Sequence, residues 1–534
     1  MNAKKHVERL GQMRSTRGTT ESHWQECLDY AVPRKADITR THYPGDKRNL
    51  HLFDSTAEQA NEMLASALYS MLTNLTVIFF ELTTGDKFLD DEDDVRVWLK
   101  ESAETMFHVL NNSNFQTEIH EIYVDLCSIG TACLSMEEDD DLHIRFASRH
   151  MGGIYVAENN LGVIDTVYRS FKWKVRQAVQ EWGKIEPLEK YMSSQEQDIE
   201  ILHAVYPRIE RDSRMKNPGN MKFASDYILV DSQTLLTSSG YRSFPYAVPR
   251  WTKSTGEIYG RSPTMKALPD IKMINEMMKT TISAAQKVMD PPLMVPDDGF
   301  ILPVDTTPAG LNYYRAGSQD RIQPFGNDAR IDFGYQVMDD VRKRIRDAYH
   351  INQLQLAQGP QMTATEVNQR TEESMRLIGP VLGRQQPELL RPMIDRLFEI
   401  LFRKGIIKEP PDVLRGTKVD VQYTSTIAKA QRSTEVQNLL RAFQVASPFI
   451  QADPQAMQVY DADEIARWTA GMYGAPTRVI RDKRAIAKMR AEIAKVQQMQ
   501  MQQEQELRAT EGAKNLAPVA AAVKQEMTNG GQGT

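Results

Sequence analysis

The stretch that decides the fold is SPTMKALPDIKMINEMMKTTISAAQKVMDPP, residues 262–292. Ser262 is a favourable N-cap and Pro263 suits the first position of a helix. Asp290-Pro291-Pro292 must end the helix, because proline has no backbone N–H and disfavours helix in the residue before it. Between these signals, one stripe is apolar at helical spacing: Leu268, Ile271, Ile274, Met278, Ile282, Ala285 and Met289. We predict one helix of about 27 residues, roughly 40 Å long.

A second long helix is predicted over residues 328–350. Its apolar face comprises Ile331, Tyr335, Met338, Val341, Ile345 and Ala348, and at about 22 residues it would be roughly 33 Å long. The sequence between the two helices contains proline and glycine, with short strand-like runs at 293–296, 311–315 and 322–325. The sequence therefore predicts a helical hairpin with a small β tip at its far end.

The region before this hairpin mixes helix and strand signals. Ser55 and Glu58 have the spacing of a capping box, and the acidic run 90–94 suits the start of another helix. Alternating or turn-bounded apolar runs then predict strands at 142–146, 154–157, 163–168, 201–206 and 227–230. The predicted class is α+β and mainly helical.

The region after the hairpin is predicted to be mostly helical. Residues 352–362, NQLQLAQGPQM, are polar and contain Gly359-Pro360, which indicates an exposed loop. A helix restarts at Thr363 and is bent or broken by its prolines, and Gly405 ends it. Helical patterns continue to about residue 505, whereas residues 506–534 have the composition of a disordered tail.

Composition restricts the class of function. The 534 residues carry a formal net charge of -6, without the basic surplus of proteins that grip DNA phosphates. Any contact with DNA is therefore expected to be local or sliding. The three cysteines show no metal-type spacing and are too few for a disulfide framework. The N-terminus shows no signal peptide, and polar residues interrupt the apolar stretch 63–82, so we expect no membrane span.

Motifs of catalysis are absent from the sequence. It contains no GxxxxGK[ST], GxGxxG, GxSxG or HExxH pattern, so we expect neither an enzyme nor a cofactor. Residues 151–154 are interpreted as a turn and not a phosphate loop, and His143 and His150 do not make a metal site. The acidic run 137–141 could bind divalent cations, but it lacks the ligand spacing of a calcium loop, and we favour a solvated turn.

A basic cluster lies on the second long helix and comprises Arg342, Lys343, Arg344 and Arg346. One interpretation is an ordinary polar helix face paired with Asp339, Asp340 and Asp347. The other is contact with phosphates inside a channel. Both stay open at the level of sequence.

Several segments, taken in order, resemble one family. They are RNLHLFDSTA (48–57), YAVPRW (246–251), GEIYGRSP (256–263), ALPDIK (267–272) and MTATEV (362–367). Their order and the chain length resemble the portal, or head-to-tail connector, proteins of short-tailed, podovirus-type double-stranded DNA bacteriophages. The resemblance extends from about residue 5 to residue 480.

The resemblance implies a division of the chain along the portal fold, whose members form rings, typically of twelve copies. Residues 1–262 would be the wing, 263–290 and 328–350 the two stem helices, 291–327 the clip and 351–362 the tunnel loop. Residues 363–434 would return to the wing as a bent helix and a strand, 435–505 would form the helical crown, and 506–534 the tail.

The resemblance also implies a function and partners. The ring would be a channel at one capsid vertex of the virion, made in the host bacterial cytoplasm, for genome packaging, retention and ejection. Double-stranded DNA would pass without sequence specificity. The expected protein partners are the major capsid protein, the scaffolding protein, the terminase large subunit, the tail adaptor and internal core proteins. The alternative is a non-enzymatic helical scaffold or tail adaptor of a virion.

Candidate site residues follow from this assignment. The DNA-facing tunnel loop would present Gln353, Gln355, Gln358 and Gln361, neutral groups that contact phosphates without fixing them. The basic cluster on the second helix would lie along the channel. The clip would dock partners through Tyr313, Tyr314, Arg315 and Arg321. Because acidic residues offset the basic ones on both long helices, we expect a lumen that is not strongly basic.

Overall fold

The computed structural model of the protein describes part of the chain. The described residues are 2–43, 45–49, 51–90, 92–212, 217–289, 293–294, 323–324, 331–351, 379–414, 420–423, 439–448, 459–472, 481 and 486–503.

The chain divides into two compact units. The larger comprises Met1–Thr83, Lys100–Glu409 and Val419–Ile427, and the smaller comprises Thr84–Leu99, Pro410–Lys418 and Ala428–Thr534. Helices account for more of the described residues than strands do. The predicted class, mixed and mainly helical, is confirmed for the described chain.

The largest sheet is a five-stranded antiparallel meander in the larger unit. Its strands follow one another in chain order: β4 (Ile154–Glu158), β5 (Ile164–Lys174), β6 (Asp198–Pro207), β7 (Phe223–Leu229) and β8 (Thr234–Tyr241). The predicted strands at 154–157, 163–168, 201–206 and 227–230 correspond to β4 to β7. The sequence prediction missed β8, whose run TLLTSSGY alternates poorly between apolar and polar residues.

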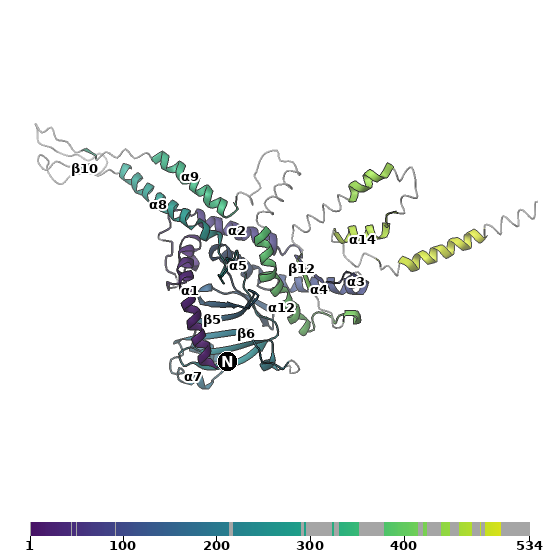
Figure 1. Cartoon of the computed structure of the whole chain (residues 1–534), viewed down its shortest axis with the longest axis horizontal. Coiled ribbons are helices and arrows are strands. Elements are labelled where there is room, and N and C mark those ends of the chain that lie inside the picture. The colour runs from purple at the N-terminus through teal and green to yellow at the C-terminus, as the bar shows by residue number, and fades with distance from the viewer. Residues whose placement is uncertain are drawn as a thin grey trace, which may run out of the picture. The chain divides into compact units, whose positions relative to one another are not determined.

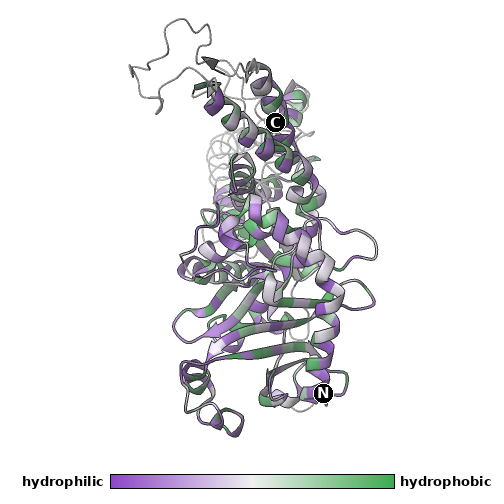
Figure 2. Cartoon of the chain, turned by 90° about the vertical axis from the view of Figure 1, so that its left-hand side faces the viewer, coloured by the Kyte–Doolittle hydropathy of each residue, from purple (hydrophilic) through white to green (hydrophobic). Residues whose placement is uncertain are grey.

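Both faces of this sheet are covered by helices. On one face, Leu202 and Ala204 of β6 pack in one cluster with Ala3 and Leu10 of α1 (Ala3–Ala31). Ile201, the residue before Leu202, packs on the other face with α6 (Val175–Trp182) and α7 (Glu186–Glu189). Successive side chains of a strand point to opposite faces, so one strand serves both layers. Figure 2 shows hydrophobic and hydrophilic stretches interspersed along the strands.

Helix α1 is fixed to the turn before β4 by a buried arginine. Arg17 donates to the carbonyl oxygens of Met151 at 2.9 Å and Gly152 at 2.8 Å, and also to that of Ile154. Its guanidinium lies 3.8 Å from the ring centroid of Tyr155. The N–H groups of Gly152 and Gly153 donate back to His150, so they are already used within the turn. The interpretation of residues 151–154 as a turn is confirmed.

Helices α2 (Thr56–Leu72) and α5 (Phe115–Ile129) pack beside each other in the larger unit. The predicted capping box at Ser55 is wrong, because the Ser55 side chain does not cap the helix. Instead, a carboxylate oxygen of Asp54 accepts from the backbone N–H of Thr56 at 3.0 Å. After α2, β1 (Phe80–Thr83) pairs with β12 (Asp420–Tyr423), so the apolar stretch 63–82 is a helix followed by a strand. No helix among the described residues is both long and apolar enough to cross a membrane.

The predicted helical hairpin is present. Helix α8 (Pro263–Met289) covers the residues expected of the first helix, and α9 (Ile331–Ala348) lies within the range predicted for the second. The two helices lie side by side (Figure 1). At the tip, β10 (Leu293–Met294) pairs with β11 (Gln323–Pro324), and the run at 311–315 lies outside the described residues. Pro269 lies inside α8 on its exposed side, where water can reach the carbonyl that loses its partner.

The helix that precedes Gly405 is interrupted as its prolines predicted. Residues 379–385 are helical, Gln386–Leu390 form a π-helical turn that contains Pro387, and α12 follows (Arg391–Arg403). Gly405 adopts φ +72, and Ile406 donates its N–H to the Leu401 carbonyl at 3.0 Å. This is the left-handed C-terminal geometry that favours glycine.

A three-stranded sheet carries the acidic run. Strand β2 (Leu134–Asp139) pairs with both β3 (His143–Ser148) and β9 (Tyr246–Ala247). The Asp139 carboxylate accepts from the backbone N–H groups of Asp141 and Leu142, both at 2.9 Å. The predicted turn is therefore confirmed only for residues 140 and 141, because residues 137–139 of the run are the end of β2 and pair with β3. No group of metal-ligating side chains occurs among the described residues.

The smaller unit is helical where it is described, as predicted for residues 435–505. Its helices include residues 439–448, α14 (Ala462–Met472) and residues 486–503. Arg490 forms a two-pronged ion pair with Asp463, at 2.6 and 2.7 Å. Helix α4 (Asp93–Asn112) has residues in both units.

Two glycines place the end of α5 against the segment that leads into α8. Gly130 follows α5 with φ +79, and a Cβ built there would lie 2.6 Å from the Gly260 carbonyl oxygen. A Cβ on Gly260 would lie 2.2 Å from the Gly130 carbonyl oxygen. Trp251 donates its N–H to that same oxygen at 2.9 Å. Neither position has room for a side chain.

We predict that Gly130→Ala destabilises the protein by more than about 2 kcal/mol, since it combines a strained backbone with a backbone clash. Gly11→Ala is the matched control, because Gly11 lies within α1 and a Cβ there meets nothing within 4 Å. The control should gain about 0.5–1 kcal/mol from the helix propensity of alanine. Urea unfolding followed by circular dichroism measures both. Equal effects of the two substitutions would contradict the conclusion that Gly130 has no room for a side chain.

Candidate functional site

The root of the hairpin is anchored by hydroxyl groups. Ser262 caps α8 as predicted, accepting from the Met265 N–H at 3.0 Å, and it donates to the Ser128 carbonyl at 2.7 Å. Thr264 donates to the Cys127 carbonyl at 2.8 Å, and its hydroxyl lies 2.6 Å from that of Tyr349. The first turn of α8 and the residue after α9 are thus joined to the last turn of α5.

A buried arginine lies next to this root. Arg250 has a side chain only 3% exposed and forms ion pairs with Glu158 and, at 2.7 Å, with Glu388. It also donates to the carbonyls of Gly162 and Ile258, at 3.2 and 3.1 Å. Burial alone would lower the pKa of Arg250, but hydrogen bonds and charge from Glu388 and Glu158 raise it above its ordinary value. Arg250 therefore links the β4–β5 turn, the 256–261 segment and the π-helical turn.

The basic cluster of α9 divides into two kinds of residue. Arg342 pairs with Asp54 and Asp339, both at 2.9 Å, and Arg344 pairs with Asp270 of α8 at 3.3 Å. Lys343 and Arg346 are exposed, and no ion pair of either is found among the described residues. The interpretation as a helix face paired with Asp339, Asp340 and Asp347 is confirmed for the Arg342–Asp339 pair, whereas the other observed partners, Asp54 and Asp270, lie outside α9.

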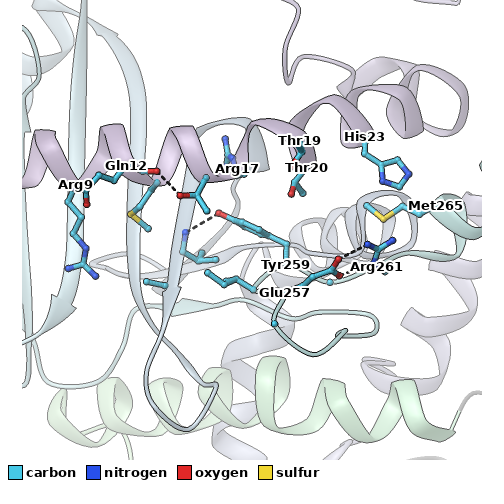
Figure 3. Close-up of a pocket in the computed structure, with 17 residues that line it drawn as sticks. Arg9, Gln12, Arg17, Thr19, Thr20, His23, Glu257, Tyr259, Arg261 and Met265 are labelled. Atoms are coloured by element: carbon cyan, nitrogen blue, oxygen red, sulfur yellow. Dashed lines mark hydrogen bonds and ion pairs between the residues drawn. The ribbon is translucent and has the colours of Figure 1, made fainter.

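A groove that the sequence did not predict runs between α1 and the 256–261 segment (Figure 3). Its volume is about 660 Å³, and α1 lines it with the charged side chains of Arg9 and Arg17 as well as with uncharged ones such as Gln12 and Thr16. On the opposite wall, Arg261 forms an ion pair with Glu257, and the Tyr259 hydroxyl accepts from the Val156 N–H at 3.4 Å.

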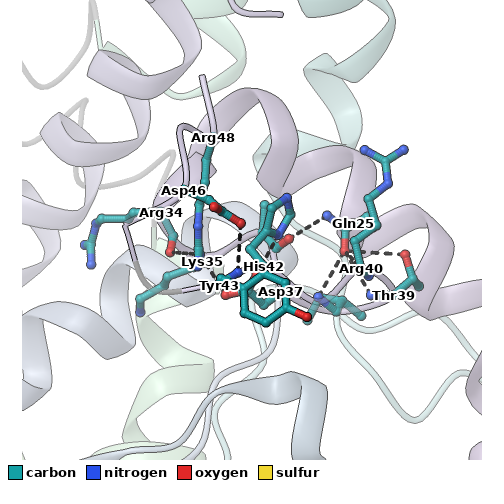
Figure 4. Close-up of polar contacts among 12 residues, drawn as sticks. Gln25, Arg34, Lys35, Asp37, Thr39, Arg40, His42, Tyr43, Asp46 and Arg48 are labelled. Carbon is teal, nitrogen blue, oxygen red and sulfur yellow. Dashed lines mark hydrogen bonds and ion pairs between the residues drawn. The ribbon is translucent and has the colours of Figure 1, made fainter. Parts of the chain in front are cut away.

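A second polar cluster fixes the segment after α1 (Figure 4). The Gln25 side-chain oxygen accepts from the N–H groups of Ile38 and Thr39, at 3.0 and 2.9 Å. Asp37 pairs with His42 at 2.8 Å and with Arg48 at 2.7 Å. These contacts order an irregular loop, and the first residues of the RNLHLFDSTA segment belong to it.

The histidines have structural roles. His150 accepts from the Gly152 N–H at 3.2 Å and contacts the Lys35 carbonyl at 2.9 Å, while His143 starts β3 with φ +65. His203 is buried between Ser225 and Tyr246, and burial lowers its pKa to about 3, helped by the charges of Arg169 and Arg149. It is neutral near pH 7 and serves as a hydrogen-bonding member of the core.

The other predicted site residues cannot be placed. The tunnel-loop candidates Gln353, Gln355, Gln358 and Gln361 lie outside the described residues. So do the clip candidates Tyr313, Tyr314, Arg315 and Arg321. What is placed is the framework that carries both loops, namely α8, α9 and their anchored root.

Comparison with known proteins identifies the family. Residues 3–480 match the family model described as bacteriophage head to tail connecting protein. The chain is 31% identical to the probable portal protein of Bordetella phage BPP-1 over 93% of this chain and 92% of that one. It is 30% identical to the portal protein of Salmonella phage epsilon15 over 96% and 94% of the two chains. The chain belongs to the bacteriophage head-to-tail connecting, or portal, family, which is a structural family of the virion.

We predict that Arg250→Met destabilises the protein by more than about 2 kcal/mol, because Glu158 and Glu388 lose the buried guanidinium that they share and keep only the more exposed Lys253 and Arg384 as partners. The matched control is Arg261→Met. Both side chains of its ion pair with Glu257 are exposed to solvent, and such pairs contribute at most about 1 kcal/mol to stability. Chemical denaturation compares the two variants. If both variants lose the same free energy of unfolding, Arg250 does not hold the β4–β5 turn, the 256–261 segment and the π-helical turn together.

Proposed function

We propose that copies of this chain close into a ring, typically of twelve in this family, which forms the channel at one capsid vertex. The genome would enter during packaging, be retained and leave during ejection. The observation that carries the proposal is the α8–α9 hairpin with its rigid root, in a chain that matches the connector family over most of its length. Such hairpins, arranged around one axis, would provide the wall of a pore.

The charges of the hairpin favour sliding of DNA over tight binding. Duplex DNA carries one negative charge per roughly 1.7 Å of its axis, so a strongly basic wall would hold it. On α8 and α9, Arg344 pairs with Asp270 and Arg342 with Asp339, while Lys279 lies 3.7 Å from Glu276. Lys343 and Arg346 remain as scattered cations that can touch phosphates weakly. The glutamines of residues 353–361 would add neutral contacts in a tunnel loop.

The proposed partners follow from the same assignment. The tip of the hairpin, residues 291–327, would be the clip that meets the terminase large subunit and later the tail adaptor. The major capsid protein, scaffolding protein and internal core proteins would contact the outer and inner parts of the ring. Energy for packaging would come from the terminase, because the sequence contains no nucleotide-binding motif.

We predict that the purified chain forms a large ring with a central hole. Negative-stain microscopy shows the hole, and native mass spectrometry gives the number of copies. A monomer or dimer under all assembly conditions would instead favour the alternative of a helical scaffold or tail adaptor.

We further predict that deleting residues 353–361 leaves ring assembly intact but reduces the amount of DNA packaged or retained. The reason is that this polar loop is the part proposed to contact DNA, whereas the deletion leaves in place Ser262, Thr264 and Tyr349, which anchor the hairpin root. Complementation of a portal-deficient phage, with DNA per particle measured, tests this. Failure of the shortened chain to form rings would refute the division of roles.

A further inference from the structure

Four residues in front of α2, His51 to Asp54, are held by both helices of the hairpin. From α8, the Asn275 amide group donates to the His51 carbonyl at 2.9 Å and accepts from the Phe53 N–H at 2.7 Å. Asn275 is only 3% exposed. The NH₂ group and the oxygen of one buried amide side chain therefore both bind this short segment. We name residues 51–54 the strap.

From α9, the strap is held through a carboxylate. Arg342 donates to one oxygen of Asp54 through Nε at 3.0 Å and through a terminal nitrogen at 2.9 Å. The other oxygen of Asp54 accepts from the N–H of Thr56, the first residue of α2. Asp54 thus connects α9 to the N-terminus of α2. Burial raises the pKa of Asp54, but hydrogen bonds from Thr56 and Arg342 leave it below its ordinary value.

The two attachments lie on neighbouring residues of the chain, so a displacement of one is passed on to the other. Asn275 holds Phe53 and Arg342 holds Asp54, so only one peptide unit separates them, and a peptide unit cannot stretch beyond about 3.8 Å between Cα atoms. Hydrogen bonds and ion pairs depend more steeply on geometry than apolar contacts do. The buried Asn275 amide and the partly buried Arg342–Asp54 pair would therefore lose their partners when displaced by an ångström or two. Other polar contacts of the hairpin, such as Lys272–Glu26 at 2.8 Å, are half-exposed and correspondingly weak.

We propose that the strap is a mechanical link that makes α8, α9 and the start of α2 move together. A displacement of α9 pulls on Asp54, and Asp54 must either move the first turn of α2 or give up its cation in a buried environment. Asn275 and Arg342 are positioning residues in this link. The proposal is independent of the proposed channel function, but it would give a channel wall a route to the body of each subunit.

Arg342→Lys tests the link in the full-length chain. Lysine keeps the charge but cannot reproduce the two-nitrogen contact of the guanidinium. The measurement is hydrogen exchange by mass spectrometry on overlapping peptides that isolate the amides of Phe53 and Thr56. Phe53 is the informative site, because its acceptor lies on α8 and is untouched by the substitution. We expect exchange at Phe53 to accelerate by about tenfold or more, together with that at Thr56.

Two controls separate coupling from general destabilisation. Arg344→Lys changes an exposed ion pair on the same helix and should leave Phe53 unchanged. Amides of the five-stranded sheet should keep their wild-type exchange in both variants. Faster exchange at Thr56 with an unaltered Phe53 would overturn the proposal, since the two attachments would then act independently.

The reciprocal variant keeps the test decisive if Arg342→Lys does not fold. Asn275→Ala removes the α8 attachment and should accelerate exchange at Thr56, whose acceptor is Asp54, because coupling between two sites is reciprocal. Unchanged exchange at Thr56 would again overturn the link. Unfolding midpoints of both single variants and the double variant complete the cycle, in which additive effects would count against coupling.

Discussion

The backbones of Gly130 and Gly260 touch so closely that neither residue can carry a side chain. A Cβ on either glycine would lie under 3 Å from the carbonyl oxygen of the other. Around this contact, Gly260 donates its N–H to the Thr131 hydroxyl at 2.8 Å, and Trp251 donates to the Gly130 carbonyl. The end of α5, the segment beside Arg250 and the start of α8 are thereby held at one place. The direction in which α8 leaves the body depends on this contact.

The interactions of α8 and α9 change in kind along the hairpin. Near the root, they are directional and buried or partly buried, as with Thr264, Asn275 and Arg342. Further out they become exposed, and Met289 at the end of α8 is 87% exposed. A single subunit therefore supports the root of its hairpin but covers little of the distal part. This fits a proposed ring, in which neighbouring hairpins would cover one another. The lumen would then be lined by side chains whose charges are mostly balanced by ion pairs.

Local signals explain why the hairpin could be predicted in detail. Ser262 caps α8 through its own side chain, and the prolines at 291–292 exclude a continued helix, so both ends are encoded within a few residues. The same reasoning failed at Ser55, because Asp54 competes for the cap and is in turn held by Arg342, 288 positions away. The candidate site was predicted less well. The sequence identified Arg342 and Arg344 as charged but could not tell that both would be paired.

The sequence by itself determined the class of the protein, the two long helices, most strands of the meander and the absence of known catalytic motifs, since these depend on periodicity, caps and motifs that are local in the chain. The order of the five segments between residues 48 and 367 also carried the family resemblance. Tertiary structure alone decided that Arg250 lies between Glu158 and Glu388, that β1 pairs with β12, and that residues 51–54 touch both helices. The physical reason is that buried ion pairs and strand partners are chosen by proximity in the folded chain. Many carboxylates in the sequence could pair with a given arginine, and only packing brings one of them within hydrogen-bonding distance.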